Sequence, residues 1–140
     1  MFGKHPIFAG SATQTVIALS SGESEFYSAV RGACQLLGMK APLNDLGFEF
    51  AAEMGTDSSA SKGLASRRGA GQVRHIHCPA LWLQQAVSRR RLTLVKKAGA
   101  TLIADIGTKA GIASAKMWDL LERFGCTRAA GRSGAALAMV

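Results

Sequence analysis

The segment Thr15–Leu37 reads TVIALSSGESEFYSAVRGACQLL, and it predicts a strand followed by a long helix. The β-branched run Thr15–Leu19 favours an extended strand. Ser20 stands three residues before Glu23, which is the spacing of a capping box at a helix N-terminus. We therefore expect a helix to begin after Ser20 and to end at Gly38, a residue type that commonly follows a helix.

Strand-like and helical segments alternate along the rest of the chain, a pattern that is typical of an α/β domain. The expected helices are Lys40–Leu46 (ending at Gly47), Ser59–Ser66, Ile76–Val87, Leu102–Lys109 and Ala113–Phe124. The expected extended segments are Phe48–Met54 and Leu92–Val95. We expect residues 1–126 to form the domain and residues 127–140, rich in Gly and Ala, to form a flexible tail.

The composition favours a single globular domain. The chain has 140 residues, of which 48% are hydrophobic, and this length is sufficient to bury one core. No apolar run reaches about 18 residues, so no membrane span is expected. Pro6 interrupts the N-terminal stretch where a signal peptide would be apolar. Three widely separated cysteines suit a reducing compartment. We therefore expect an intracellular protein, cytoplasmic or nuclear, that is not secreted.

The charge is strongly basic and unevenly distributed. Lys plus Arg number 17 and Asp plus Glu number 9, which gives a net charge of +8. Between Asp57 and Asp105 there is no acidic residue, whereas nine bases occur: Lys62, Arg67, Arg68, Arg74, Arg89, Arg90, Arg91, Lys96 and Lys97. One interpretation is a solvated basic face. The other is a track for a nucleic-acid backbone, with all of these residues except Lys62 as the contacting side chains.

Three of the nine acidic residues stand at positions that suit chemistry. Glu25 lies inside the first predicted helix, Asp57 follows the second predicted strand at its carboxyl end, and Asp105 has apolar neighbours. Open α/β sheets bind ligands at the carboxyl ends of their strands. Converging carboxylates also suit Mg²⁺, which prefers oxygen ligands. The alternative is structural, because an acidic residue at a helix start commonly serves as a cap.

Four motifs together resemble the ribonuclease H domain of copia-type LTR retrotransposon polyproteins. Residues 17–26 (IALSSGESEF) are similar to the family's ALSS(T/G)EAEY segment, and residues 56–60 (TDSSA) to its (C/T)DNxSA motif. Residues 74–77 (RHIH) resemble its K/R-H-I-D stretch, and residues 102–109 (LIADIGTK) resemble LADxLTK. The motifs occur in the family's order between about residues 10 and 125.

The resemblance implies a fold, an activity and a set of site residues. The fold is a mixed α/β ribonuclease H-like sheet flanked by helices, and the activity is endonucleolytic hydrolysis of the RNA strand of an RNA/DNA hybrid. Glu25, Asp57 and Asp105 match three of the four metal-binding carboxylates, with Mg²⁺, or Mn²⁺ in its place, as the cofactor. Glu25 is preferred to Glu23 as a ligand because Glu23 fits the capping role. An upstream reverse transcriptase segment of the polyprotein is an implied partner.

The chain also departs from the family pattern. The family's first catalytic aspartate lies on its first strand, and residues 1–22 contain no acidic residue. We therefore expect a sheet that lacks its first strands, in a polyprotein fragment or a decayed copy. Three hypotheses remain open: a metal-dependent ribonuclease H, an inactive relic or accessory module that binds nucleic acid through its basic stretch, and an unstable fragment with no independent function. For Trp82 and Trp118 there are two alternatives: stacking on nucleic-acid bases, or packing in the core.

Overall fold

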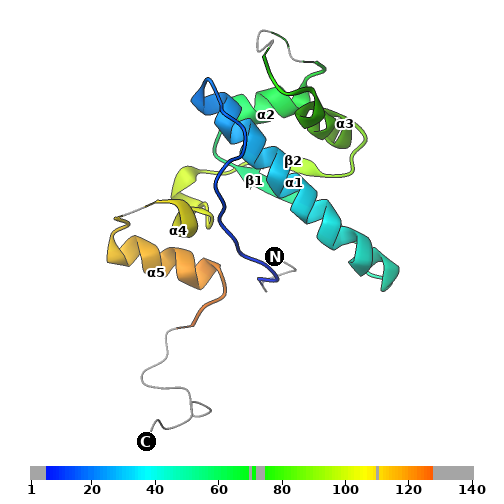
Figure 1. Ribbon diagram of the computed structural model, residues 1–140. Helices are drawn as coiled ribbons and strands as arrows, with labels where there is room; N and C mark the ends of the chain where they lie inside the picture. Colours follow the sequence, from blue (N-terminus) through cyan, green and yellow to red (C-terminus); the bar gives the residue numbers. More distant parts are fainter. Residues whose placement is uncertain (1–5, 70, 72–74, 110, 128–140) are drawn as a thin grey trace, which may run out of the picture. The chain divides into compact units, whose positions relative to one another are not determined.

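The computed structural model describes residues 6–69, 71, 75–109 and 111–127 of the chain. Their architecture is mixed, with helices and one small parallel sheet (Figure 1). The chain divides into two compact units. Unit 2 is the continuous segment Ala12–Leu102, and unit 1 combines Met1–Ser11 with Ile103–Val140.

The first helix of unit 2, α1, spans Ser21–Asp45 and confirms the predicted capping box. The Ser20 hydroxyl accepts a hydrogen bond of 3.2 Å from the backbone N–H of Glu23. The Glu23 carboxylate in turn accepts one of 2.8 Å from the backbone N–H of Leu19. The first bond satisfies an N–H group that the helix itself leaves without a partner. The second differs from the usual capping box, because it reaches the residue before the N-cap and not Ser20 itself.

The predicted helix end at Gly38 is wrong, because α1 continues without a break to Asp45. A glycine inside a helix costs only about 1 kcal/mol relative to alanine. Leu36 and Leu37, directly before Gly38, are partly buried against the core. The predicted stop at Gly47 is confirmed: Gly47 has a φ of +86°, and its N–H donates to the carbonyl of Asn44.

The sheet consists of β1 (Glu53–Thr56) and β2 (Thr93–Lys96), which run parallel with Glu53 opposite Thr93. The predicted extended segments at 48–54 and 92–95 therefore lie at these strands with shifted boundaries. The connection between the strands contains α2 (Ser59–Ser66), which is the predicted helix, a 3₁₀ turn at Cys78–Leu81 and α3 (Trp82–Ser88). A second 3₁₀ turn, Gly99–Thr101, follows β2.

The core of unit 2 lies where α1, α2 and α3 meet the sheet. Phe26 of α1, Leu83 of α3 and Leu92 before β2 are at most 2% exposed. Trp82 is partly buried and packs against this core, so its environment agrees with core packing. This core joins the two strands to the helices of the connection between them.

The predicted strand at Thr15–Leu19 is wrong. This segment has no regular structure, and Ile17 and Leu19 are 87% and 71% exposed. A strand needs a neighbour for its backbone N–H and C=O groups. The N–H of Leu19 donates to the Glu23 carboxylate instead, and β1 and β2 pair with each other.

Unit 1 contains α4 (Asp105–Thr108) and α5 (Ser114–Arg123). The predicted helix at 102–109 is therefore shorter than expected, whereas the helix at 113–124 agrees closely. Leu120 is fully buried, and Trp118 is 39% exposed. The tail from residue 128 onward lies outside the described residues. No helix in the described part of the chain combines the length and apolar character needed to cross a membrane.

Candidate functional site

Asp57 stands at the carboxyl end of β1, where the sheet meets α2. Its carboxylate is exposed, and the next residue, Ser58, caps α2 by accepting a hydrogen bond of 3.1 Å from Ser61 N–H. A Cβ atom placed on Gly99 would lie 3.3 Å from Asp57 Oδ2, so the 3₁₀ turn after β2 closely approaches this carboxylate. The absence of a side chain at Gly99 permits this close approach.

Glu25 lies on the part of α1 that packs against the start of α2. The hydroxyl of Ser61, in the first turn of α2, donates to the backbone carbonyl of Glu25 at 3.4 Å. The Glu25 side chain is exposed. The structure therefore places Glu25 and Asp57 on neighbouring elements of unit 2, both accessible to solvent.

Asp105 opens α4 in unit 1 and differs from the other two carboxylates in its surroundings. It is 3% exposed, which agrees with its apolar sequence neighbours. Its Oδ2 accepts a hydrogen bond of 2.7 Å from Lys109 Nζ. Among the described residues, no three His, Cys, Asp or Glu side chains form a group that could hold a metal ion.

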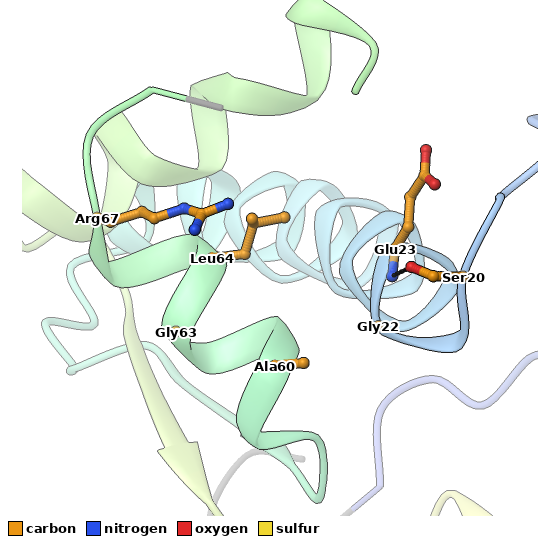
Figure 2. A pocket seen from close by; sticks show the side chains of 7 residues that line it. All are labelled: Ser20, Gly22, Glu23, Ala60, Gly63, Leu64 and Arg67. Atoms are coloured by element: carbon orange, nitrogen blue, oxygen red, sulfur yellow. Dashed lines mark hydrogen bonds between the residues drawn. The ribbon is translucent and has the colours of Figure 1, made fainter. Parts of the chain in front are cut away.

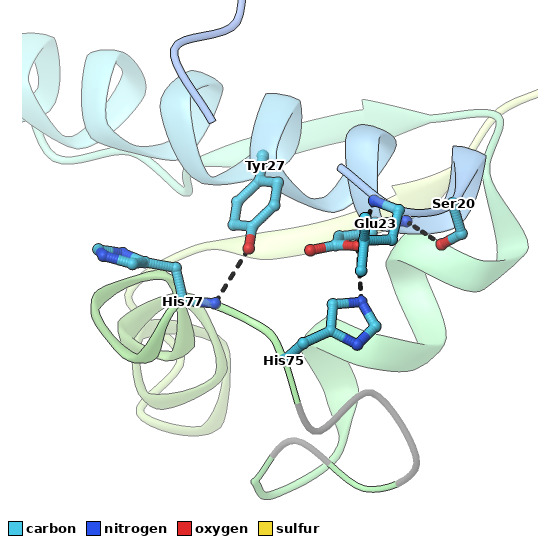
Figure 3. A network of polar contacts seen from close by, with 6 residues as sticks. Ser20, Glu23, Tyr27, His75 and His77 are labelled. Carbon is cyan, nitrogen blue, oxygen red and sulfur yellow. Dashed lines mark hydrogen bonds and ion pairs between the residues drawn. The ribbon is translucent and has the colours of Figure 1, made fainter. Parts of the chain in front are cut away.

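A polar network ties the segment before α3 to α1 (Figure 3). His75 Nε2 lies 2.9 Å from Glu23 Oε2, and the Tyr27 hydroxyl accepts a hydrogen bond of 3.0 Å from the backbone N–H of His77. The N–H of Leu19, together with His75 and Tyr27, lowers the pKa of the Glu23 carboxyl, although burial opposes this. Burial raises the pKa of Tyr27. Glu23 is thus a structural carboxylate, as its capping position predicts.

A shallow hollow of about 390 Å³ separates the first turn of α1 from α2 (Figure 2). Its lining is mostly small or apolar and consists of Ser20, Gly22, Glu23, Ala60, Gly63, Leu64 and Arg67. A Cβ atom on Gly22 would lie 3.0 Å from the Cβ of Ala60, so glycine permits this close approach of the helices. Arg67, predicted to contact nucleic acid, is half-buried beside this hollow.

The other described members of the predicted basic track are exposed. They are Arg68, Arg89, Arg90, Arg91, Lys96 and Lys97, whereas Arg74 lies outside the described residues. Lys97 Nζ forms an ion pair of 2.9 Å with Glu53, and Lys96 Nζ donates to the Ser59 hydroxyl. Arg68 and Arg89, distant in sequence, line one hollow. The structure therefore brings together some but not all of these bases.

Arg90 occupies a backbone conformation that usually belongs to glycine. Its φ is +56°, and among the described residues it is the only one other than glycine with a positive φ. The N–H of Arg90 donates to Val87 and that of Arg91 to Ala86, which completes a Schellman turn at the end of α3. At α1 the same turn uses Gly47. An arginine at this position provides a positive charge that glycine would not, but its left-handed backbone conformation costs free energy.

We expect Arg90→Gly to raise the free energy of unfolding by about 1 kcal/mol, because the left-handed conformation costs an L-residue roughly that much. Chemical denaturation measures the change as a higher midpoint at an unchanged slope. Arg91→Gly removes the same charge at a position without a positive φ, so it should give no gain. Equal gains in both variants would attribute the effect to charge and contradict the argument from backbone strain.

The sequence analysis did not identify Gln84 as an important residue. Its side chain is 7% exposed and forms three hydrogen bonds to backbone groups. A signal was present: Ala80, Leu83 and Val87 share the helical spacing that places Gln84 on the core-facing side. A polar residue in such a row must find partners when it is buried.

The chain was also compared with known proteins. A scan of protein-family models and searches of curated proteins and of solved structures gave no match to this chain.

Proposed function

We propose that the chain is a ribonuclease H-like domain, derived from a copia-type retrotransposon, that hydrolyses the RNA strand of an RNA/DNA hybrid. The observation that carries this proposal is the position of Asp57. Its exposed carboxylate follows a parallel strand and lies close to the turn at Gly99, and Glu25 lies on the adjacent helix. This is the edge at which parallel α/β sheets bind their ligands.

The donor set supports magnesium as the cofactor. Glu25 and Asp57 offer exposed carboxylate oxygens, which Mg²⁺ prefers. A magnesium ion held by these carboxylates would stabilise the negative charge that develops on the phosphodiester oxygens. In this proposal the carboxylates bind the metal ion beside the phosphodiester that is cleaved, and the exposed arginines bind the nucleic-acid backbone.

A second candidate function is nucleic-acid binding without cleavage. The observation that favours it is the engagement of Asp105, whose buried carboxylate already accepts a hydrogen bond from Lys109. In this alternative the basic residues bind the nucleic acid, and the carboxylates stabilise the fold. The two functions share a partner but differ in metal dependence and product.

The test is an assay with an end-labelled RNA/DNA hybrid in Mg²⁺, in Mn²⁺ and in a chelator, with single-stranded RNA as the control substrate. We expect cleavage of the hybrid's RNA strand with either ion and none with the chelator. Binding of the hybrid without cleavage in any condition would contradict the nuclease and favour the second candidate. A folded chain that neither binds nor cleaves the hybrid would overturn both.

A further inference from the structure

A polar hollow lies between α3 and the segment that follows α2. Its lining residues are Arg68, Gly69, Leu81, Gln84, Gln85, Ser88 and Arg89, and its volume is about 370 Å³. Two arginines thus border one hollow, although 20 residues separate them along the chain. Among the described residues, no carboxylate forms an ion pair with either group. The hollow is therefore positively charged and open to an anion.

The backbone beside Arg68 is fixed by Gln84. The Gln84 carboxamide accepts a hydrogen bond of 2.8 Å from Gly69 N–H, and it donates to the carbonyls of Gly69 at 3.0 Å and Leu64 at 2.8 Å. Because Gln84 is buried and its bonds reach both sides of the turn, the turn is held against α3. Such preorganisation lowers the entropic cost of binding a ligand there.

The backbone of Arg89 is fixed by the end of α3. Its N–H donates to the carbonyl of Gln85 at 3.0 Å, and the Schellman turn follows directly. Both arginines therefore extend from ordered backbone, while their side chains remain exposed. The planar guanidinium can donate two parallel hydrogen bonds to phosphate, which makes arginine well suited to this anion.

We propose that this hollow is a phosphate subsite, in which Arg68 and Arg89 together bind one phosphate of a nucleic-acid backbone and Gln84 acts as the positioning residue. This inference rests on the nucleic-acid binding proposed above and goes further by naming where the backbone is bound. The side chains of Gln85 and Ser88, which share the lining, are the polar groups available to the adjoining sugar and phosphate.

The test measures the affinity of a fluorescently labelled RNA/DNA hybrid by anisotropy, in a chelator so that the substrate stays intact. The chains compared are the wild type, Arg68→Gln, Arg89→Gln, the double variant and Arg31→Gln. Arg31 is the matched control, because it is exposed and loses the same charge but lies outside the basic track and does not line the hollow. Thermal unfolding of each variant verifies that it is folded.

We expect Arg68→Gln and Arg89→Gln each to weaken binding by about 10-fold, a typical effect of losing a strong charged contact. Arg31→Gln should weaken it by less than about 3-fold, since it loses only a general attraction. Affinity should fall with salt, and the slope of log K against log salt should decrease by about 1 in the double variant, as one lost phosphate contact requires.

Two results would overturn the subsite and leave the proposed function in place. One is equal affinities for the Arg68, Arg89 and Arg31 variants. The other is a slope change near 2 in the double variant, since each arginine would then neutralise a separate phosphate. A folded wild-type chain that does not bind the hybrid would overturn the subsite and the proposed function together. Strong competition by inorganic phosphate at concentrations that leave the ionic strength unchanged would assign the hollow to the free anion and not to the backbone.

Discussion

Asp57→Asn is expected to abolish detectable hybrid cleavage while leaving the fold intact. The substitution keeps the size of the side chain but removes the negative charge that holds a divalent cation. Loss of a group that merely orients a metal ligand already costs about 10- to 100-fold in activity or metal affinity, so loss of a ligand should exceed about 100-fold. Initial rates on the labelled hybrid in saturating Mg²⁺ provide the measurement.

Asp45→Asn is the matched control for this prediction. Asp45 is also exposed and loses the same charge, but it ends α1 far along the helix from Glu25. Its cleavage rate should equal that of the wild type. Since Asp57 is exposed, its substitution should change the unfolding free energy by no more than about 0.5 kcal/mol. Cleavage by Asp57→Asn at the wild-type rate would rule out the assigned role.

Gln84→Leu is expected to lower the free energy of unfolding by about 3 kcal/mol, because leaving buried polar groups without partners costs roughly 1–3 kcal/mol each. The variant deprives the carbonyl of Leu64 and both backbone groups of Gly69 of their bonds. Water can reach Gly69, which is exposed, so the Leu64 carbonyl should contribute most. Urea denaturation with the slope held in common measures the loss.

Gln85→Leu is the control, because it makes the same chemical change one residue further along α3 at an exposed position. It should alter the unfolding free energy by no more than about 0.5 kcal/mol. If both glutamine variants lost the same small amount, the bonds of Gln84 would have no special importance for stability. The positioning role proposed for this residue would then lose its support.

Local signals in the sequence predicted helix starts and stops well where a side chain or a glycine determines them. The Ser20 cap and the Gly47 stop are confirmed because each depends on groups within a few residues. Gly38 shows the limit of such signals, since α1 continues through it to Asp45. Tertiary context can outweigh the low helix propensity of glycine at such positions.

Signals that depend on distant partners were less informative. The composition of Thr15–Leu19 favours a strand, but a strand also requires a neighbouring backbone, and the sequence does not specify one. Likewise, spacing places Glu25, Asp57 and Asp105 in separate segments without indicating which of them meet. The contact between Ser61 and Glu25 comes from the packing of α1 on α2, which no local pattern encodes.

The parallel pairing of β1 with β2 affects the order in which unit 2 can fold. Glu53 and Thr93 are partners across the sheet, although some 40 residues intervene. Closing a loop of this size lowers the conformational entropy of the chain before any hydrogen bond between the strands has formed. Such pairing is therefore intrinsically slow. The intervening residues include Arg68, Gln84 and Arg89. A chain still emerging from the ribosome therefore cannot pair β1 with β2 until residues 93–96 have been synthesised.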